Sequence, residues 1–331
     1  MGSEMDDIRS KLPDKPDRFV DQLRTTIRKR GLSYSTEKTY VHWVLRFIRH
    51  SGMRHPSQMG PEDVTDFLDH ISVVEHCATN TQRIALNAMV FLYDKHLGQE
   101  LGPLDYQYAR KRRRMPTVFA HDEALAVIRQ LRGTHAMVGR LMYGSGLRVS
   151  EAVSLRIKDL DFRHQQLIVR DGKGSNERMT LLPATLYEDL QQQIDTVRAL
   201  HAYDTQRGYG SVFMPDALNR KYPNASRQTQ WQFLFPAQNV AEDPRSGTIR
   251  RHHMHASTIQ RAVAKAIKLA RVRRRASSHT FRHSFATRLI ETGYDIKLVQ
   301  SLLGHRDIRT TEIYLHVVRN RGGAIKSPID R

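Results

Sequence analysis

A break at Gly102-Pro103 divides this chain into two parts with different residue patterns. Before the break, over about residues 19–97, apolar residues recur at the three- and four-residue spacing of amphipathic helices. We predict four helices in this part, with Ser35 as the cap of the second and Pro61 opening the third. Amphipathic helices bury their apolar faces against one another, so the first part is predicted to be a small helical domain.

Beyond the break, helices alternate with short strands. Two helices, at about 122–132 and 135–144, precede three strand-like segments at 160–162, 166–170 and 178–182. A long amphipathic helix follows, then an irregular stretch at 203–254, and helices resume with Ser257 as a cap. The predicted fold class is therefore mainly α, with a small antiparallel β-sheet in the second domain.

The charge of the chain indicates a polyanionic partner. Its 331 residues hold 53 lysines and arginines against 34 acidic residues, a net charge of +19. Positive charge is spread along the whole chain, and no apolar run could span a bilayer, so nucleic acid is favoured over a membrane. Neither a secretion signal nor a second cysteine besides Cys77 is found, and the chain is expected to be cytoplasmic, without disulfides or a cysteine-based zinc site.

Two arginines, one lysine, several histidines and one tyrosine form an ordered set in the second part of the chain. The set consists of Arg148 in Gly144-Ser145-Gly146-Leu147-Arg148, Lys173 between two glycines, His279, Arg282, His283, His305 and Tyr314. Phosphodiester transfer uses such groups, because charge builds on the non-bridging oxygens while one oxygen arrives and another leaves. A surface ion pair for either arginine, or a core position for Tyr314, would explain one residue but not the ordered set.

This ordered set, with Glu151 after Arg148, resembles that of the tyrosine recombinase family. The resemblance implies that Tyr314 attacks the scissile phosphate and forms a 3′-phosphotyrosyl ester. It implies that Arg148 and Arg282 hold the non-bridging oxygens, as rigid and permanently charged groups can. It also implies a C-shaped clamp of two domains around DNA.

The remaining members of the set follow from the same resemblance. His305 is expected to bond the same oxygens, and His279 to take the proton of a phenol whose ordinary pKa is about 10. Lys173, at a hairpin tip, would protonate the leaving 5′-oxygen. Glu151 and His283 are expected to be supporting residues: Glu151 would pair with or orient Arg148, and His283 would either buttress Arg282 or meet Tyr314. The arginines, lysine and histidines replace a metal in this family, so no cofactor is expected.

Two positions depart from the common family pattern. Phe281 stands where leucine is usual, a change on a buried face. Ala120 stands where a capping threonine is usual, so the following helix lacks a side-chain cap worth roughly 1 kcal/mol. Neither change touches the reacting groups.

A long insertion narrows the resemblance to the integron integrases. Lys173 and His279 lie 106 residues apart (279 − 173), more than one hairpin and one helix need. The insertion, at about 203–254, is rich in aromatic and basic residues, and it resembles the extra segment of that subfamily. Integron integrases insert and excise gene cassettes, and one of their substrates is a folded single-stranded hairpin with extrahelical bases.

Four residues of this insertion are candidates for reading extrahelical bases. They are Trp231 and His253, with Pro244 and His252 as further candidates, because aromatic, imidazole and flat apolar groups stack on bases. Alternatively, Trp231 belongs to the core of the insertion itself. A zinc site at His252, His253 and His255 is disfavoured, because the three do not share a helical face and no acidic residue lies among them.

The resemblance also sets domain boundaries. These are a flexible segment at 1–16, a helical core-binding (SAM-like) DNA-binding domain at 17–102, a basic linker at 103–116 and a catalytic domain at 117–331. The linker carries Arg110, Lys111, Arg112, Arg113 and Arg114, which are expected along a phosphate backbone unless they form a merely solvated segment. A tail at about 322–331 is expected to dock on a neighbouring protomer in a tetramer on two DNA sites, or else to be disordered.

Three other functions remain open. A recombinase of Xer or phage type would act on duplex sites, and a type IB topoisomerase would relax supercoils with almost the same residues. A DNA-binding regulator that has lost the chemistry would show a degraded motif, whereas the set here is complete.

Overall fold

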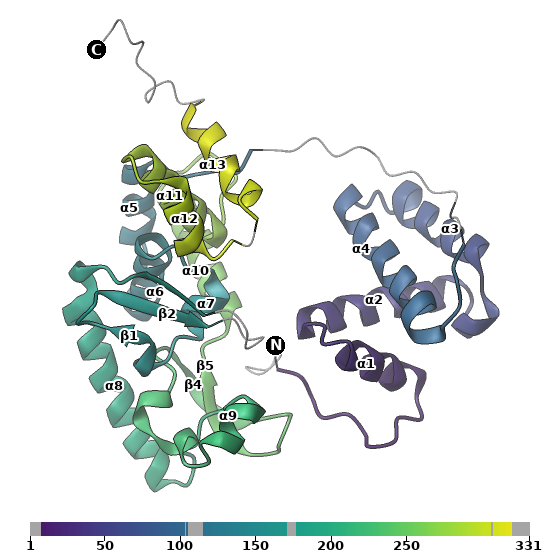
Figure 1. Ribbon diagram of the computed structural model, residues 1–331, viewed down its shortest axis with the longest axis horizontal. Coiled ribbons are helices and arrows are strands. Elements are labelled where there is room, and N and C mark those ends of the chain that lie inside the picture. Colours follow the sequence, from purple (N-terminus) through teal and green to yellow (C-terminus); the bar gives the residue numbers. More distant parts are fainter. Residues whose placement is uncertain (1–7, 103, 105–114, 171–176, 306, 320–331) are drawn as a thin grey trace, which may run out of the picture. The chain divides into compact units, whose positions relative to one another are not determined.

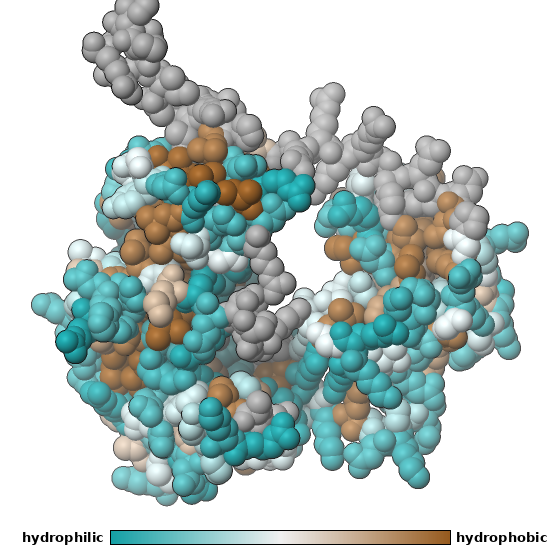
Figure 2. Space-filling model, in the orientation of Figure 1, coloured by the Kyte–Doolittle hydropathy of each residue, from teal (hydrophilic) through white to brown (hydrophobic). Residues whose placement is uncertain are grey.

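The computed structural model describes residues 8–102, 104, 115–170, 177–305 and 307–319. The described residues form two compact units: those of 8–104 together with 244–246, and those of 115–243 and 247–319. Hydrophilic side chains cover much of the visible face of each unit (Figure 2). Among the described residues, no helix combines the length and apolar character needed to cross a membrane.

The first unit is a bundle of four helices (Figure 1). They are α1 (Phe19–Lys29), α2 (Tyr34–His50), α3 (Pro61–Asp69) and α4 (Thr79–Val90), with π-helical turns at His70–Val74 and Phe91–Leu97. Phe47 lies at its centre, with its ring 5.5 Å from that of Phe67 and 6.5 Å from that of Tyr93. The predicted cap of α2 was wrong, because Ser33 and not Ser35 accepts the amide hydrogen of Thr36.

The second unit is also mainly helical, so the predicted fold class is confirmed. Its helices are α5 (His121–Arg129), α6 (Gly133–Gly144), α7 (Val149–Val153), α8 (Tyr187–Gln206), α9 (Asp216–Lys221), α10 (Ala256–Leu269), α11 (Ser278–Glu291), α12 (Ile296–Leu303) and α13 (Arg309–Arg319). As expected from Ala120, α5 has no side-chain cap, although the Glu123 carboxylate accepts the Ala120 amide hydrogen at 2.8 Å.

A three-stranded antiparallel sheet lies in the second unit, in the order β1 (Leu160–Asp161), β2 (Gln166–Arg170) and β3 (Glu177–Leu181). Leu167 and Val169 of β2 are buried in one apolar cluster with Leu190 and Ile194 of α8. The same cluster includes Phe281 of α11, which is fully buried. This packing joins the sheet to the helix that carries Arg282.

The stretch at 203–254 was predicted to be irregular, and that prediction was wrong. It contains the short helix α9 and a second antiparallel sheet, β4 (Pro236–Glu242) paired with β5 (Ile249–His253). A bulge between Pro236 and Val240 interrupts the pairing, which weakens the alternation by which a strand is recognised in sequence. The predicted cap at Ser257 was also wrong, since the ring of His255 accepts the Ser257 amide hydrogen.

Candidate active site

Arg148 and Arg282 meet at the carboxylate of Glu151. Arg148 is the residue before α7, and its Nη1 donates to Glu151 Oε1 at 2.7 Å. Nη1 of Arg282, on α11, lies 3.6 Å from Glu151 Oε2. The side chain of Arg148 is 42% exposed and that of Arg282 only 1%. Arg148 therefore reaches the surface, whereas Arg282 is buried.

Arg282 also joins the two turns that carry its neighbours in the site. It donates from Nη1 to the Gly146 carbonyl at 2.8 Å and from Nη2 to the Leu303 carbonyl. Gly146 stands two residues before Arg148, and Leu303 two residues before His305. A Cβ at Gly146 would lie 2.4 Å from the ring of Phe285, and its φ is +66°, so glycine is required there.

Tyr314 lies on α13, with 2% of its surface exposed. Its hydroxyl is 2.9 Å from Nδ1 of His283. The ring of His305 stacks at 6.5 Å from the Tyr314 ring, and the ring of His279 lies 4.5 Å from that of His283. The family resemblance predicted that His279 takes the tyrosyl proton, whereas the nitrogen within hydrogen-bond distance of the Tyr314 hydroxyl belongs to His283.

Burial and nearby arginines keep the histidines of this site neutral at pH 7. Burial, and then neighbouring positive groups, lowers the pKa of His283 to about 4 and that of His305 to about 4. The pKa of His279 is lowered by the same two causes. Burial raises the pKa of Tyr314, although Arg282 and Arg148 oppose the rise. Neutral imidazoles beside a protonated phenol can accept its proton when it reacts.

These lowered pKa values predict that stability falls in mild acid. The unfolded histidines bind protons near pH 6.5, whereas folded His283 and His305 resist them down to about pH 4. The unfolded state therefore binds more protons between these values, so the free energy of unfolding should rise as pH rises from 4 to 6.5. Urea unfolding at several pH values measures this slope, and His283→Gln should reduce it. An unchanged slope in that variant would contradict the lowered pKa of His283.

Arg178 is a member of this site that the sequence analysis missed. It lies on β3, where its Nη1 and Nη2 donate to the two oxygens of Glu151 at 2.8 and 2.7 Å. Burial alone would raise the pKa of Glu151, but Arg178, the Arg148 amide and Arg282 together lower it to about 2. Strand alternation could have revealed Arg178, because it shares the inward face of β3 with buried Thr180.

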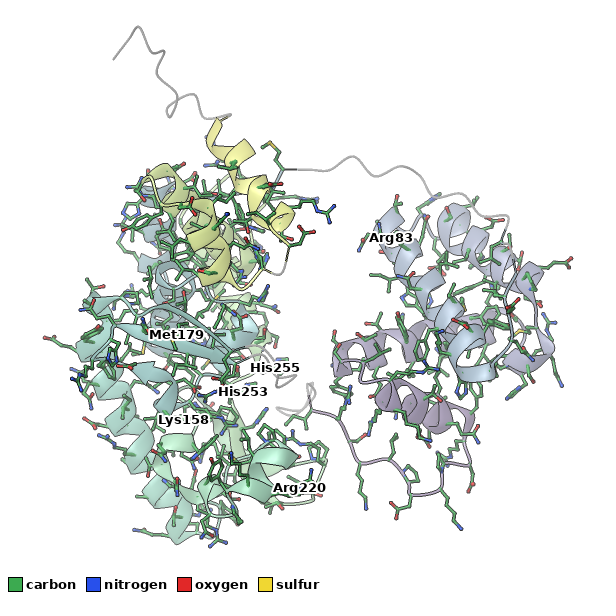
Figure 3. The ribbon with its side chains drawn as sticks, in the orientation of Figure 1. Arg83, Lys158, Met179, Arg220, His253 and His255 are labelled. Atoms are coloured by element: carbon green, nitrogen blue, oxygen red, sulfur yellow. The ribbon has the colours of Figure 1, made fainter. Side chains whose placement is uncertain are left out.

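A second cluster, of aromatic and basic groups, surrounds Phe233 in the insertion. The ring of His253 lies 5.0 Å from the Phe233 ring, and the Arg156 guanidinium lies over Phe233 at 4.5 Å. The same guanidinium is 5.8 Å from the Trp231 ring, and the Lys158 ammonium stands 3.3 Å from the centre of that ring. We call Trp231, Phe233, His253, Arg156 and Lys158 the aromatic cluster; Figure 3 labels Lys158 and His253.

Exposure differs among the candidate base-reading residues. Trp231 and His253 are partly exposed, whereas His252 is only 6% exposed and packs 4.0 Å from the His253 ring. Pro244 lies in the turn between β4 and β5 and is also partly exposed. Trp231 and His253 are therefore the more exposed rings, and His252 packs against His253.

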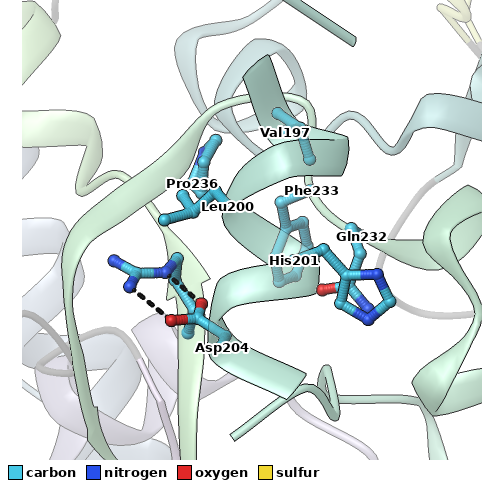
Figure 4. A pocket seen from close by; sticks show the side chains of 8 residues that line it. Val197, Leu200, His201, Asp204, Gln232, Phe233 and Pro236 are labelled. Carbon is cyan, nitrogen blue, oxygen red and sulfur yellow. Dashed lines mark hydrogen bonds and ion pairs between the residues drawn. The ribbon is translucent and has the colours of Figure 1, made fainter. Parts of the chain in front are cut away.

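A buried ion pair fixes β5, the strand that carries His253. Arg251 of β5 donates to Asp204 of α8 at 2.6 and 2.9 Å and to the Ala237 carbonyl at 2.8 Å. The pair borders a small pocket (Figure 4), lined by Val197, Leu200, His201, Asp204, Gln232, Phe233, Pro236 and Arg251. Because Asp204 and Arg251 are each well buried, their pairing holds the hairpin against α8.

Several predicted site residues lie outside the described residues. They are Lys173 and the basic run Arg110, Lys111, Arg112, Arg113 and Arg114. The predicted tail at 322–331 lies outside them as well. The other predicted catalytic and supporting residues, Arg148, Glu151, His279, Arg282, His283, His305 and Tyr314, occupy one site.

A protein-family model matches the part of the chain that contains this site. The model of the phage integrase family matches residues 118–321, which is more than half of the chain. This chain belongs to the phage integrase family. It is thus a tyrosine recombinase, a site-specific DNA recombinase. Residues 19–103 match the N-terminal SAM-like domain of phage integrases.

Individual relatives cover almost the whole recombinase. Proteins called integrase/recombinase from Escherichia coli and Pseudomonas aeruginosa are each 44% identical over 315 residues, 95% of this chain and 93% of theirs. The tyrosine recombinase XerD of Mycobacterium leprae is 28% identical over 320 residues, covering 89% of this chain and 90% of its own.

Solved structures share the fold of the recombinase. The Tn1549 transposon integrase in complex with transposon right end DNA gives a TM-score of 0.61 at 18% identity, covering 92% of this chain and 97% of its own. The XerH recombinase bound to palindromic difH substrate gives 0.59 at 19% identity, covering 91% and 82%. At these identities the likeness concerns the fold.

Proposed function

We propose that this tyrosine recombinase is an integron integrase, which inserts and excises gene cassettes in the bacterial cytoplasm. The aromatic cluster in the insertion supports the proposal. A recombinase that reads duplex DNA through phosphates and groove edges has no need of a partly exposed tryptophan among cations. Extrahelical bases of a folded single strand stack on such a surface, because every base has a flat π-face.

The cleavage reaction is assigned to the first site. Tyr314 attacks the scissile phosphate and forms a 3′-phosphotyrosyl ester, which keeps the energy of the broken bond for rejoining. His283, at 2.9 Å, accepts the phenolic proton, and His279 lies against His283 where it can support that transfer. Arg148, Arg282 and His305 hold the non-bridging oxygens. Lys173 is proposed to protonate the leaving 5′-oxygen.

The base-reading role is assigned to the aromatic cluster. Trp231 and His253 supply partly exposed rings, His252 is buried against His253, and Pro244 is proposed as a further base-stacking residue. Lys158 and Arg156 add positive charge beside the rings, which attracts the phosphates that flank an extruded base. This arrangement favours a nucleotide over an uncharged aromatic ligand.

The assembly follows from the same assignment. We propose domains at 17–102 and 117–331 that close as a C-shaped clamp around DNA, with the basic linker at 103–116 along the phosphate backbone. Four protomers on two DNA sites would exchange the tails at 322–331. The duplex attachment site and the folded hairpin site are the proposed partners.

The test compares binding of a folded strand with binding of a duplex. The protein is incubated with a pool of hairpins that carry bulged bases and with a matched pool of duplexes. The DNA molecules recovered as covalent adduct are then used as substrates in the binding measurements. Trp231→Ala should weaken binding of the recovered hairpin by about 1–3 kcal/mol, or roughly 5- to 150-fold in Kd. Duplex binding should change less than about threefold, because the groove and phosphate contacts remain.

One control and one further variant complete this experiment. Tyr222→Ala removes a ring that is 47% exposed in the same insertion and should leave hairpin binding unchanged. His253→Ala should act like Trp231→Ala. If hairpin adducts form equally well in the Trp231 variant, or adducts arise on duplex alone, the chain is a recombinase of Xer or phage type.

A further inference from the structure

Glu151 stands between the arginines that are proposed to bind the phosphate. It accepts a hydrogen bond from Arg148 at 2.7 Å and lies 3.6 Å from Arg282. Its pKa is lowered to about 2, so the carboxylate is ionised at pH 7. An ionised carboxylate and a phosphate are alternative partners for the same guanidinium groups. Glu151 would therefore weaken phosphate binding unless another group satisfied it.

Arg178 is the group that satisfies Glu151. Its guanidinium makes two parallel hydrogen bonds, one to each carboxylate oxygen, at 2.8 and 2.7 Å. Arg148 makes one such bond with its side chain, and Arg282 stands farther away. The paired fork is the strongest arginine–carboxylate geometry. With 14% of its side chain exposed, Arg178 is also the better shielded partner compared with Arg148 at 42%.

The remaining donor of Arg178 reaches the segment that carries His305. Nε donates to the Leu302 carbonyl at 2.9 Å, near the C-terminal end of α12. Gly304 ends that helix with φ +65°, and a Cβ there would lie 2.7 Å from Arg178 Cδ. Arg178 and Arg282 thus hold the consecutive carbonyls of Leu302 and Leu303. Both arginines therefore stabilise the turn before His305 by hydrogen bonds to its carbonyl groups.

We propose that Arg178 is a positioning residue that neutralises Glu151, so that Arg148 and Arg282 keep their charge for the phosphate. Three arginines and one carboxylate leave two positive charges at the site. Without Arg178 one positive charge is left, and Glu151 draws Arg148 and Arg282 toward itself. The inference rests on the proposed phosphate-binding roles of Arg148 and Arg282, and it adds to them a residue of β3 that touches no substrate.

The experiment measures single-turnover cleavage at saturating DNA. The substrate is a duplex that the wild-type protein captures as a covalent adduct. It is synthesised again as a bridging phosphorothiolate, with sulfur in place of the leaving 5′-oxygen, because a thiol leaves without being protonated by an acid. Arg178→Gln should slow cleavage about 10²-fold, the loss typical of one electrostatic group in an active site. Its Kd for DNA should stay within about threefold, because most phosphate contacts lie elsewhere.

Two further variants separate charge from scaffolding. Arg178→Lys keeps the charge and loses the fork, and it should remain within about tenfold of the wild type. Adding Glu151→Gln to Arg178→Gln removes the unmatched carboxylate and should restore cleavage at least about tenfold, since Arg148 and Arg282 are released. Urea unfolding of each variant shows that the protein is folded at the assay temperature.

The outcomes distinguish the inference from the proposed function. If the double variant is as slow as Arg178→Gln, or Arg178→Lys is as slow as Arg178→Gln, charge neutralisation is wrong and Arg178 is a scaffold residue. Cleavage by Arg178→Gln at the wild-type rate would also overturn the inference. In each case wild-type cleavage stands, and so does the recombinase chemistry. Absence of any wild-type adduct would instead remove the proposed function together with the inference.

Discussion

Replacing Tyr314 by phenylalanine is expected to abolish covalent attachment of the protein to DNA. The loss should be about 10⁴-fold or more, as is usual when a covalent nucleophile is removed. Phenylalanine fills the same space, which matters because Tyr314 is 2% exposed and packs with Phe285 and Leu303. His283 loses its hydroxyl partner, but it is neutral and needs no counter-charge. DNA binding should therefore remain within about twofold of the wild type.

Gel analysis of the phosphorothiolate substrate measures this effect directly. Tyr294→Phe is a matched control, because Tyr294 is 53% exposed and lies before α12 on the same unit. The control should form adduct at the wild-type rate. Adduct in Tyr314→Phe, attached through another residue, would show that Tyr314 is not the nucleophile.

Replacing Arg148 by alanine should slow cleavage about 10²- to 10³-fold, because one preorganised donor to the developing charge is lost. The fold should tolerate this change better than loss of Arg282. The Arg148 backbone amide, which donates to Glu151 at 2.7 Å, is kept in alanine, so α7 still begins normally. Arg282, by contrast, holds the carbonyls of Gly146 and Leu303, which would be left without their partner.

Arg198→Ala is the matched control for this variant, since Arg198 is 55% exposed and pairs with Asp195 on α8 as Arg148 pairs with Glu151. It should cleave DNA at the wild-type rate. Arg148→Lys should recover only part of the lost rate, because an ammonium cannot present the planar fork. A rate for Arg148→Ala equal to the control would remove Arg148 from the phosphate site.

Local patterns were enough to predict much of the fold. Helical spacing predicts α1 to α4, and alternation around the glycines at 172 and 174 predicts β2 and β3 nearly to the residue. The errors lie where side chains compete or strands are irregular. Ser33 and Ser35 are equally good caps by residue type, and a bulge interrupts the pairing of β4 with β5.

The chemistry of the chain was determined by its sequence alone. Arg148, His279, Arg282, His305 and Tyr314 predicted a tyrosine recombinase by their residue types and their order along the chain, and the family comparison confirms that class. These residues can be recognised without knowledge of any tertiary contact. The same reasoning identified the insertion and its aromatic residues.

Which groups touch one another was decided by the tertiary structure. The pairing of Tyr314 with His283, and of Glu151 with Arg178, joins residues 31 and 27 positions apart on different elements. Helical or strand periodicity relates a residue only to neighbours on its own element, so it cannot select such partners. Packing then sets both pKa values: burial lowers that of His283, whereas the arginines brought to Glu151 outweigh its burial and lower its pKa.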